Sequence, residues 1–283
     1  MNVRHFLKAA SLVLLIGPLA ACAGSMFGGG DSGPTIETAP PDVLFKDANT
    51  QLDKGNYTKA AEKFEEVDRQ HPYSKEARES ILMAAVAYQQ AGKGPEAVAA
   101  ARRYLTIHPG TKEAALAQNI VATAYYDRIN DASRDQADTK KAVVELETLL
   151  NRYPDSRYAE GAKKRIRLAR DVLAASEMNI GRYYQKKANY LAAINRFKVV
   201  VTEYQNTAHV EEALARLTEC YYTLGVVNEA QTAAAVLGHN FPDSKWYKDS
   251  YALLASKGLE PREDTGSWLS RQLGKLTKTS SAQ

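Results

Sequence analysis

The sequence has few of the residues that build metal, redox or disulfide sites. Its 283 residues include two cysteines, Cys22 and Cys220, and five histidines. Two cysteines cannot form a disulfide framework or a four-sulfur metal site, and no two histidines are spaced as a metal-binding pair. Asp131, Asp135 and Asp138 lack the glycine and the closing glutamate of a calcium loop. We therefore expect no metal, no cofactor and no catalytic residues, in a protein that is not an enzyme.

The chain also lacks a strong charge of one sign and a long hydrophobic run. Its formal net charge of +4 falls by two if the first 21 residues are removed, because Arg4 and Lys8 are their only charged residues. So small a charge gives no reason to expect a nucleic-acid partner. The apolar stretch 9–20 is broken by Gly17 and Pro18. It is too short to span a bilayer and is typical of a secretory signal.

A motif for lipid attachment follows this stretch. Leu-Ala-Ala-Cys at 19–22 resembles the bacterial lipoprotein box, in which the cysteine thiol takes a diacylglyceryl group and the signal, here residues 1–21, is cut off. Two or three acyl chains anchor a protein firmly, so we expect Cys22 to hold the mature chain on a membrane. Residue 23 is alanine rather than aspartate, which in such lipoproteins favours release to the outer membrane. The alternative is a secretory signal with an incidental cysteine.

Two segments without a regular apolar period flank the rest of the chain. Residues 22–41 are rich in glycine, proline, serine and threonine, which predicts a flexible tether with a reach on the order of 25 Å. Residues 258–283 form a polar tail in which Trp268, Leu269 and two further leucines have helical spacing. We expect most of this tail to be disordered, with a short amphipathic helix that docks on a membrane surface or a partner as the alternative.

Between these segments, from residue 42 to residue 257, apolar residues recur every three or four positions and strand-like alternation is absent. This periodicity predicts an all-α domain. Five segments share a frame: an alanine, apolar residues four and seven positions later, then a proline and a serine or threonine. Gln205 replaces the proline once, which predicts a looser turn. The five alanines of the frame are Ala60, Ala97, Ala142, Ala193 and Ala230.

Each column of the frame has a physical cause. Alanine lets two helix backbones approach closely, and the two apolar residues after it lie on the same inward face. Gly55, Gly92 and Gly225 stand five positions before an alanine. There, glycine ends the preceding helix in a left-handed cap, and the later proline stops the next helix. The serine or threonine after the proline is expected to cap the helix that follows.

This frame resembles the tetratricopeptide repeat. The resemblance implies a solenoid of about five helix–turn–helix pairs, with a C-terminal capping helix within 243–257. Eight additional residues before Ala142 predict a loop at 130–135. Fourteen additional residues within 156–187 amount to about four turns. They should lengthen a helix without rotating its inward face, so that its two glycines are merely tolerated.

The lipoprotein box and the irregular repeats together resemble the BamD family of outer-membrane assembly lipoproteins. The family implies a non-enzymatic subunit of the β-barrel assembly machine on the periplasmic face of the outer membrane. Its implied partners are the periplasmic POTRA domains of the barrel subunit BamA, other assembly lipoproteins and unfolded outer-membrane proteins. The segments that carry the resemblance are 55–74, 127–136, 151–174 and 190–197.

The resemblance also implies binding residues. Asn195 and Arg196 stand where the family has a residue pair near the BamA contact. The groove of a tetratricopeptide solenoid is lined by the first helix of each pair, so residues that face it are candidates for client contact. Polar amides among them could hold an extended client backbone, and Arg182 its terminal carboxylate. These candidate client residues are Asn49, Leu52, Gln89, Arg182 and Gln185.

Two alternatives compete with this interpretation. The first is another envelope lipoprotein with tetratricopeptide repeats, such as a pilotin for a pilus secretin or a coordinator of cell division and peptidoglycan synthesis. The long helix within 156–187 and the insertion at 130–135 argue against it. The second is an enzyme such as a murein-cleaving lipoprotein, which would need a carboxylate in a saccharide-binding cleft.

Overall fold

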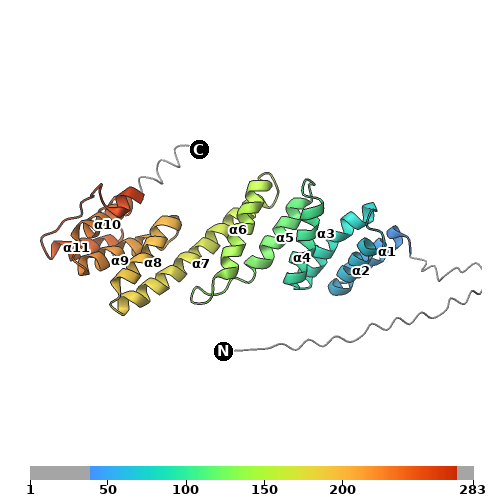
Figure 1. The fold of residues 1–283 in the computed structure, drawn as a ribbon, viewed down its shortest axis with the longest axis horizontal. Coiled ribbons are helices and arrows are strands. Elements are labelled where there is room, and N and C mark those ends of the chain that lie inside the picture. The colour runs from blue at the N-terminus through green and yellow to red at the C-terminus, as the bar shows by residue number, and fades with distance from the viewer. Residues whose placement is uncertain (1–38, 273–283) are drawn as a thin grey trace, which may run out of the picture. The chain divides into compact units, whose positions relative to one another are not determined.

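The computed structural model describes residues 39–272, in which all regular elements are α-helices (Figure 1). The predicted signal peptide, Cys22, and the tether up to residue 38 lie outside the described residues, as do residues 273–283 of the tail. The eleven long helices are α1 (Pro41–Asp53), α2 (Tyr57–Gln70), α3 (Lys75–Gln90), α4 (Gly94–Ile107), α5 (Ala114–Tyr126), α6 (Ala137–Arg152), α7 (Ala159–Lys186), α8 (Tyr190–Glu203), α9 (Val210–Thr223), α10 (Val227–Asn240) and α11 (Lys245–Ala255).

Consecutive helices pack side by side as five pairs, α1/α2 to α9/α10, and α11 covers α9 and α10 (Figure 1). The predicted all-α solenoid with a capping helix is therefore confirmed. All five alanines of the repeat frame are fully buried, as are the apolar residues four and seven positions after the first of them, Phe64 and Val67. Close approach of the helix backbones at alanine thus organises every pair, as the spacing predicted.

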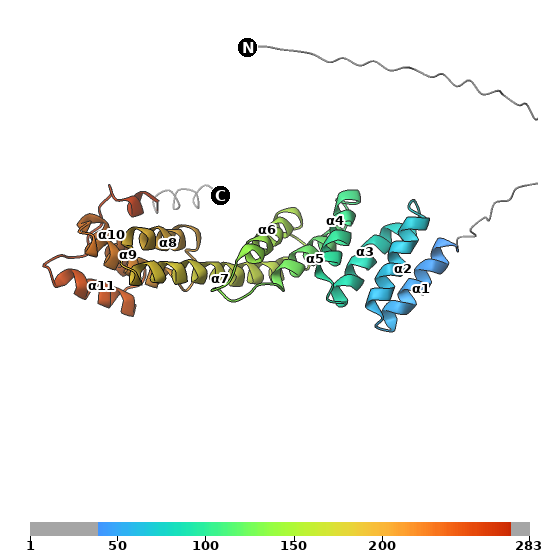
Figure 2. The same cartoon turned by 60° about the horizontal axis from the view of Figure 1, so that its bottom comes forward.

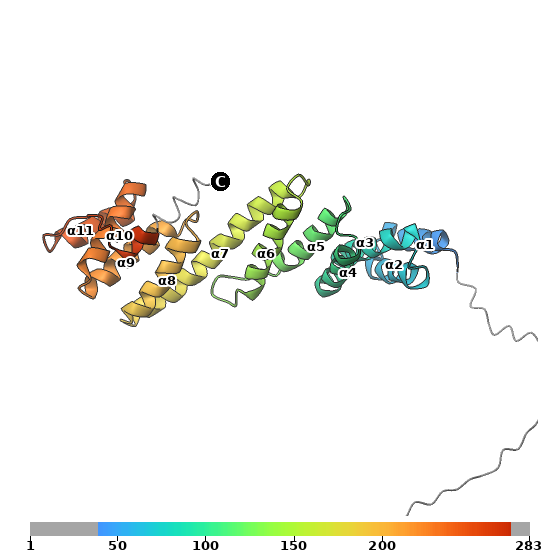
Figure 3. The same ribbon diagram turned by 45° about the horizontal axis from the view of Figure 1, so that its top comes forward.

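The side chains form three apolar clusters along the chain. One spans α1 to α5, a small second one joins α5, α6 and the first half of α7, and the third extends from the second half of α7 to α11. Helix α7 links the last two clusters, since its two halves pack against α6 and α8 (Figure 3). Its 28 residues are twice the 14 of α9, which confirms the predicted long helix.

The turns within the pairs use the left-handed conformation that the glycine column predicted. Gly55, Gly92 and Gly225 have φ of 76°, 71° and 74°. Ala188 has the same conformation after α7, with φ of 57°. The amide of Asn189 donates to the carbonyl of Tyr184, as in a Schellman cap. At this position the fold uses a residue with a Cβ where glycine is favoured by about 1 kcal/mol.

We expect Ala188→Gly to stabilise the protein. Removing the Cβ relieves the left-handed strain, partly offset by the greater freedom of glycine in the unfolded chain, so the free energy of unfolding should rise by about 0.5–1 kcal/mol. Urea unfolding followed by tryptophan fluorescence measures this change. Gly225→Ala, at an equivalent turn with φ of 74°, is the matched control and should destabilise. A stability loss in Ala188→Gly would contradict the prediction.

Of two expectations about the turns between pairs, the first is confirmed only at two turns and the second is wrong. Ser74 and Ser244 cap the next helix through their side chains, but the hydroxyl of Thr207 instead donates backward to the carbonyl of Tyr204. An additional turn precedes α5, α7 and α9, and the N-cap residues of these three helices, Glu113, Tyr158 and His209, make no side-chain cap hydrogen bond. Gln205 does not loosen its turn. The backbone amide of Thr207 donates to the carbonyl of Tyr204 over 3.1 Å, the same distance as between Ser244 and Phe241 at a turn with proline, and the Gln205 side chain donates to the carbonyl of Val201.

The expectation of a mostly disordered tail is wrong for its described part. Residues 259–267 run along α10 without regular structure, and 268–272 form a helical turn. Leu269 is 2% exposed and belongs to the C-terminal apolar cluster, against which Leu259 and Trp268 also pack. The helical spacing of Trp268 and Leu269 therefore marks an intramolecular contact.

Candidate functional site

The C-terminal candidate residues form a hydrogen-bonded network between α7 and α9. Arg182 on α7 makes a bidentate ion pair with Glu212 on α9, with nitrogen–oxygen distances of 2.8 and 2.6 Å. Gln185, one turn later, donates to Glu219 over 2.7 Å. Arg216 lies between the two glutamates and donates to both. The candidate client residues of this region are therefore already bound within the protein.

The electrostatics of this network favour the charged forms. Hydrogen bonds from Arg182 hold the pKa of the Glu212 carboxyl below its usual value, although burial acts in the opposite direction. A carboxyl whose pKa is lowered by folding adds stability above its unfolded pKa and loses that contribution as the pH falls through its folded pKa. The Arg216 guanidinium also lies 5.1 Å from the ring centroid of Trp246, which extends the network to α11.

The N-terminal candidates lie apart from this network. Asn49 and Leu52 are one turn apart on α1, and Gln89 is on α3, which packs against α1. Asn49 is half-buried and its amide donates to the carbonyl of Phe45 in its own helix, 3.0 Å away. Leu52 packs against the N-terminal cluster, and Gln89 is half-buried. The five candidate client residues thus form two groups, one on the first two repeats and one on α7 of the fourth repeat.

The candidate partner residues lie on α8 and differ in their surroundings. Asn195 is exposed, whereas the guanidinium of Arg196 donates to Glu177 on α7 over 3.1 Å. Leu191, one turn before Asn195, is 68% exposed, which is unusual for a leucine. Leu191 and Asn195 therefore form a free surface on α8, and Arg196 borders it while tying α8 to α7.

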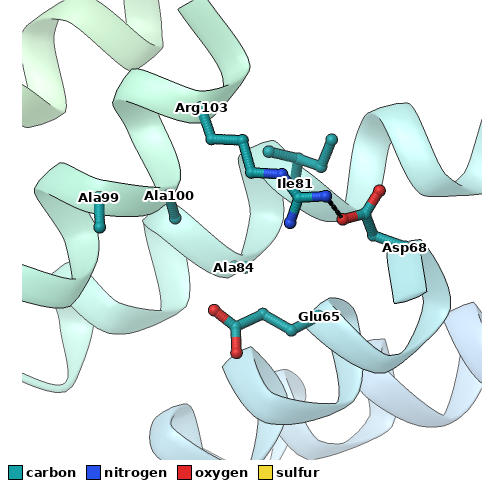
Figure 4. A pocket seen from close by; sticks show the side chains of 7 residues that line it. All are labelled: Glu65, Asp68, Ile81, Ala84, Ala99, Ala100 and Arg103. Atoms are coloured by element: carbon teal, nitrogen blue, oxygen red, sulfur yellow. Dashed lines mark ion pairs between the residues drawn. The ribbon is translucent and has the colours of Figure 1, made fainter. Parts of the chain in front are cut away.

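A hollow of about 150 Å³ lies between α2, α3 and α4 (Figure 4). Its charged lining is Glu65 and Asp68 from α2 and Arg103 from α4, and its floor consists of Ile81 and small alanines. Arg103 points to Asp68 across the hollow and pairs with it. The Asp68 side chain is 4% exposed. The arrangement neutralises a buried carboxylate and contains no nucleophile beside a base.

Sequence reasoning missed Glu212, Arg216 and Glu219, although a signal was present. Their spacing of four and three residues puts them on one helix face, and alternating charges at such spacing indicate an ion-pair ladder. No comparable signal exists for the pair of Asp68 and Arg103, because it joins two helices across 35 positions of the sequence.

Cys220, the cysteine within residues 39–272, is a core residue, as predicted. Cys220 on α9 is fully buried, and burial raises the pKa of its thiol to about 12. A thiol reacts through its thiolate, so in a Cys22→Ser background we expect Cys220 to react with Ellman's reagent at pH 8 at least about a thousandfold more slowly in the native protein than in urea. Fast labelling of the native protein would contradict this.

Metal-binding clusters and membrane-spanning helices are both absent from the described part of the chain. Residues 39–272 contain no group of three or more His, Cys, Asp or Glu side chains arranged to hold a metal ion. In that range, no helix has both the length and the apolar character that crossing a membrane requires.

Known proteins resemble this chain over most of its length. Residues 37–237 match the family YfiO, described as an outer membrane lipoprotein. The outer membrane protein assembly factor BamD of Caulobacter vibrioides is 42% identical over 251 residues, which cover 88% of this chain and 81% of that protein. BamD of Rickettsia prowazekii is 38% identical over 248 residues, 87% of this chain and 96% of that protein.

A solved structure of a TPR protein from Thermus thermophilus matches 76% of this chain and 98% of its own, with 17% identity and a TM-score of 0.33. The relatives named BamD are assembly factors, in agreement with the expectation of a non-enzymatic protein. The family match covers residues 37–237, and both relatives exceed 35% identity over most of the chain. The chain therefore belongs to the outer membrane lipoprotein family that includes the BamD assembly factors.

Proposed function

We propose that this protein is a non-enzymatic lipoprotein subunit of the complex that assembles β-barrel proteins in the outer membrane. Cys22 carries the lipid anchor, and the repeats work on the periplasmic face of a Gram-negative envelope. The observation that carries the proposal is the 42% identity to a BamD assembly factor over 88% of the chain. A row of helix pairs without catalytic chemistry in its described part suits a protein that acts by binding.

The partner in this proposal is a BamA-like barrel subunit, which binds through its POTRA domains at the C-terminal repeats, beside other assembly lipoproteins. The exposed Leu191 and Asn195 on α8 support this choice. Leu191 is 68% exposed, and covering its side chain with a partner would make a favourable contribution to the free energy of binding. Arg196 supports it less directly. Its pair with Glu177 fixes α8 on α7 and so sets the position of that surface.

Unfolded outer-membrane proteins are the proposed clients. The N-terminal group of Asn49, Leu52 and Gln89 is the first candidate for their backbone, since the Asn49 amide bonds within its own helix and not to a neighbouring one, and Gln89 is half-buried. Arg182 and Gln185 already join α7 to α9 through hydrogen bonds, and client binding would compete with these bonds. A client carboxylate that binds Arg182 has to replace the bidentate contact of Glu212.

Co-purification tests the partner. The chain carries a C-terminal tag, envelopes are extracted in mild detergent, and stoichiometric partners are identified by mass spectrometry. We expect a large outer-membrane barrel with POTRA domains at about one to one, and loss of most of it in Arg196→Leu. Arg170→Leu is the matched control, because Arg170 is a similarly exposed arginine paired with a glutamate of the neighbouring helix. Recovery of a secretin, or of no partner, would overturn the proposal.

Replacing Cys22 by serine tests the anchor separately. The variant should keep its circular dichroism spectrum and move from the membrane fraction to the soluble periplasmic fraction, since the thioether cannot form. Retention of the variant in membranes through detergent-free washes would show that Cys22 is not the anchor.

A further inference from the structure

The tail segment 259–272, here called the strap, is held on α10 by hydrogen bonds to its backbone. The side-chain amide of Gln231 donates to the backbone carbonyl of Glu260 over 2.7 Å. The backbone carbonyl of Gln231 accepts from the backbone amide of Arg262 over 3.3 Å. These reciprocal bonds use only the backbone of the strap. They therefore suit an extended polypeptide of almost any sequence.

Two further side chains of α10 continue this pattern. The hydroxyl of Thr232 accepts from the amide of Asp264 over 3.1 Å. Oε1 of Glu229 accepts from the amide of Trp268 over 2.7 Å, at the start of the helical turn. Oε2 of the same carboxylate is buried and has no hydrogen-bond donor among residues 39–272. The strap thus leaves part of the hydrogen-bonding capacity of α10 unused.

Two side chains give the contact its selectivity. Leu269 is 2% exposed and lines a cavity of about 150 Å³ between α8, α9 and α10, together with Val201, Leu214 and Phe241. The cavity leaves room beside Leu269 for a larger apolar side chain. Trp268 lies under the ammonium group of Lys198 on α8, 4.0 Å from the ring centroid.

The strap and the network around Arg182 lie on different sides of the last helix pairs, although α9 contributes to both. α8 and α10 carry the strap on one side of the helix pairs, and α7 and α11 lie on the other side (Figure 2). Lys198 is three residues after Asn195 on the same face of α8, so the strap adjoins the exposed surface formed by Leu191 and Asn195.

We infer that Lys198, Glu229, Gln231, Thr232 and the cavity form a binding groove for an extended polypeptide, of which the strap is a displaceable intramolecular occupant. Three observations support displacement: the bonds are to backbone, one buried carboxylate oxygen lacks a donor among residues 39–272, and the cavity is incompletely filled. The partner that fits is a protein segment with an extended stretch followed by an aromatic and a bulky apolar residue. This inference is independent of which complex the protein joins.

Peptide binding to the full chain tests the inference. The probe is a fluorescein-labelled peptide of residues 259–272, and its anisotropy is measured with the unchanged protein and with Leu269→Ser, which removes the anchor of the strap. We expect at least tenfold tighter binding by Leu269→Ser, because the groove is then vacant. In that background, Lys198→Ala and Gln231→Ala should each weaken binding at least threefold. Lys187→Ala removes another lysine that lies near an aromatic ring, at the C-terminal end of α7 rather than on α8 or α10, and should change nothing.

Two results would overturn the inference. One is a folded Leu269→Ser variant that does not bind the peptide, and the other is binding that Lys198→Ala and Gln231→Ala leave unchanged. If Leu269→Ser fails to fold, hydrogen exchange on the unchanged protein decides. The amides of Asp264 and Trp268 should exchange at least tenfold faster than buried amides of α9 such as that of Leu217, since a displaceable strap opens without global unfolding. Equal rates would show that the strap is a permanent part of the core.

Discussion

Gly181→Ala is expected to lower the free energy of unfolding by about 2 kcal/mol, although alanine is the better helix former by about 1 kcal/mol. Gly181 is in the interior of α7 and buried, and the ring of Phe197 on α8 packs directly on its backbone. A Cβ at this position would meet Cε1 of the ring and lie 2.8 Å from both Cδ1 and Cζ. Phe197 is fully buried within the C-terminal apolar cluster, so overpacking of about 3 kcal/mol outweighs the gain in helix propensity.

Gly161→Ala in the same helix is the matched control. A Cβ at Gly161 has no other atom within 4 Å, and the residue is exposed. The substitution should therefore raise stability by about 0.5–1 kcal/mol through helix propensity alone. Denaturant unfolding followed by tryptophan fluorescence suits Gly181→Ala, because Trp246 and Trp268 both report on the C-terminal cluster. Circular dichroism suits Gly161→Ala. Changes of the same sign in the two variants would show that packing on Phe197 does not decide the outcome.

These two glycines show where inference from the sequence stops. The spacing of apolar residues predicts α7, because fourteen additional residues keep its inward face in register, and the alanine columns predict which helices touch. Both properties are local or periodic. Whether a glycine is tolerated or required depends on the residue opposite it, here Phe197, and a single sequence does not state which residues are opposite each other.

The same limit applies to the candidate site. The position of Arg182 on the first helix of its pair predicts that it lines the groove, but its pairing with Glu212, 30 positions later, depends on the rotation of α9. The tail is a second case. The spacing of Trp268 and Leu269 indicates an amphipathic segment, whereas the polar composition of the tail favours disorder. That the tail packs on α8 and α10 could be seen only in the structure.

Arg103→Ala should destabilise the N-terminal repeats by about 3 kcal/mol. Asp68 on α2 is buried, and its charge is balanced by the guanidinium of Arg103 on α4 across the hollow between the helices. Truncating the arginine leaves a buried carboxylate without its ion-pair partner, and removal of one partner from a buried ion pair costs about 3–5 kcal/mol. The hollow admits some water after truncation, which places the expected loss at the lower end of this range.

A double-mutant cycle separates the charge from the packing of the arginine stem. Asp68→Asn keeps the shape of the side chain and removes its charge, so Arg103→Ala should cost about 1 kcal/mol or less in the Asp68→Asn background. Arg102→Ala is the control for a neighbouring arginine. Arg102 is as exposed as Arg103, but its partner Glu145 is 19% exposed where Asp68 is 4% exposed, so the substitution should cost at most about 1 kcal/mol. Circular dichroism in urea measures all four variants of the cycle. If Arg103→Ala lowers the free energy of unfolding equally with aspartate and with asparagine at position 68, the ion pair does not decide the stability. The arginine then stabilises α4 through its aliphatic stem, and Asp68 remains stable without an ion-pair partner.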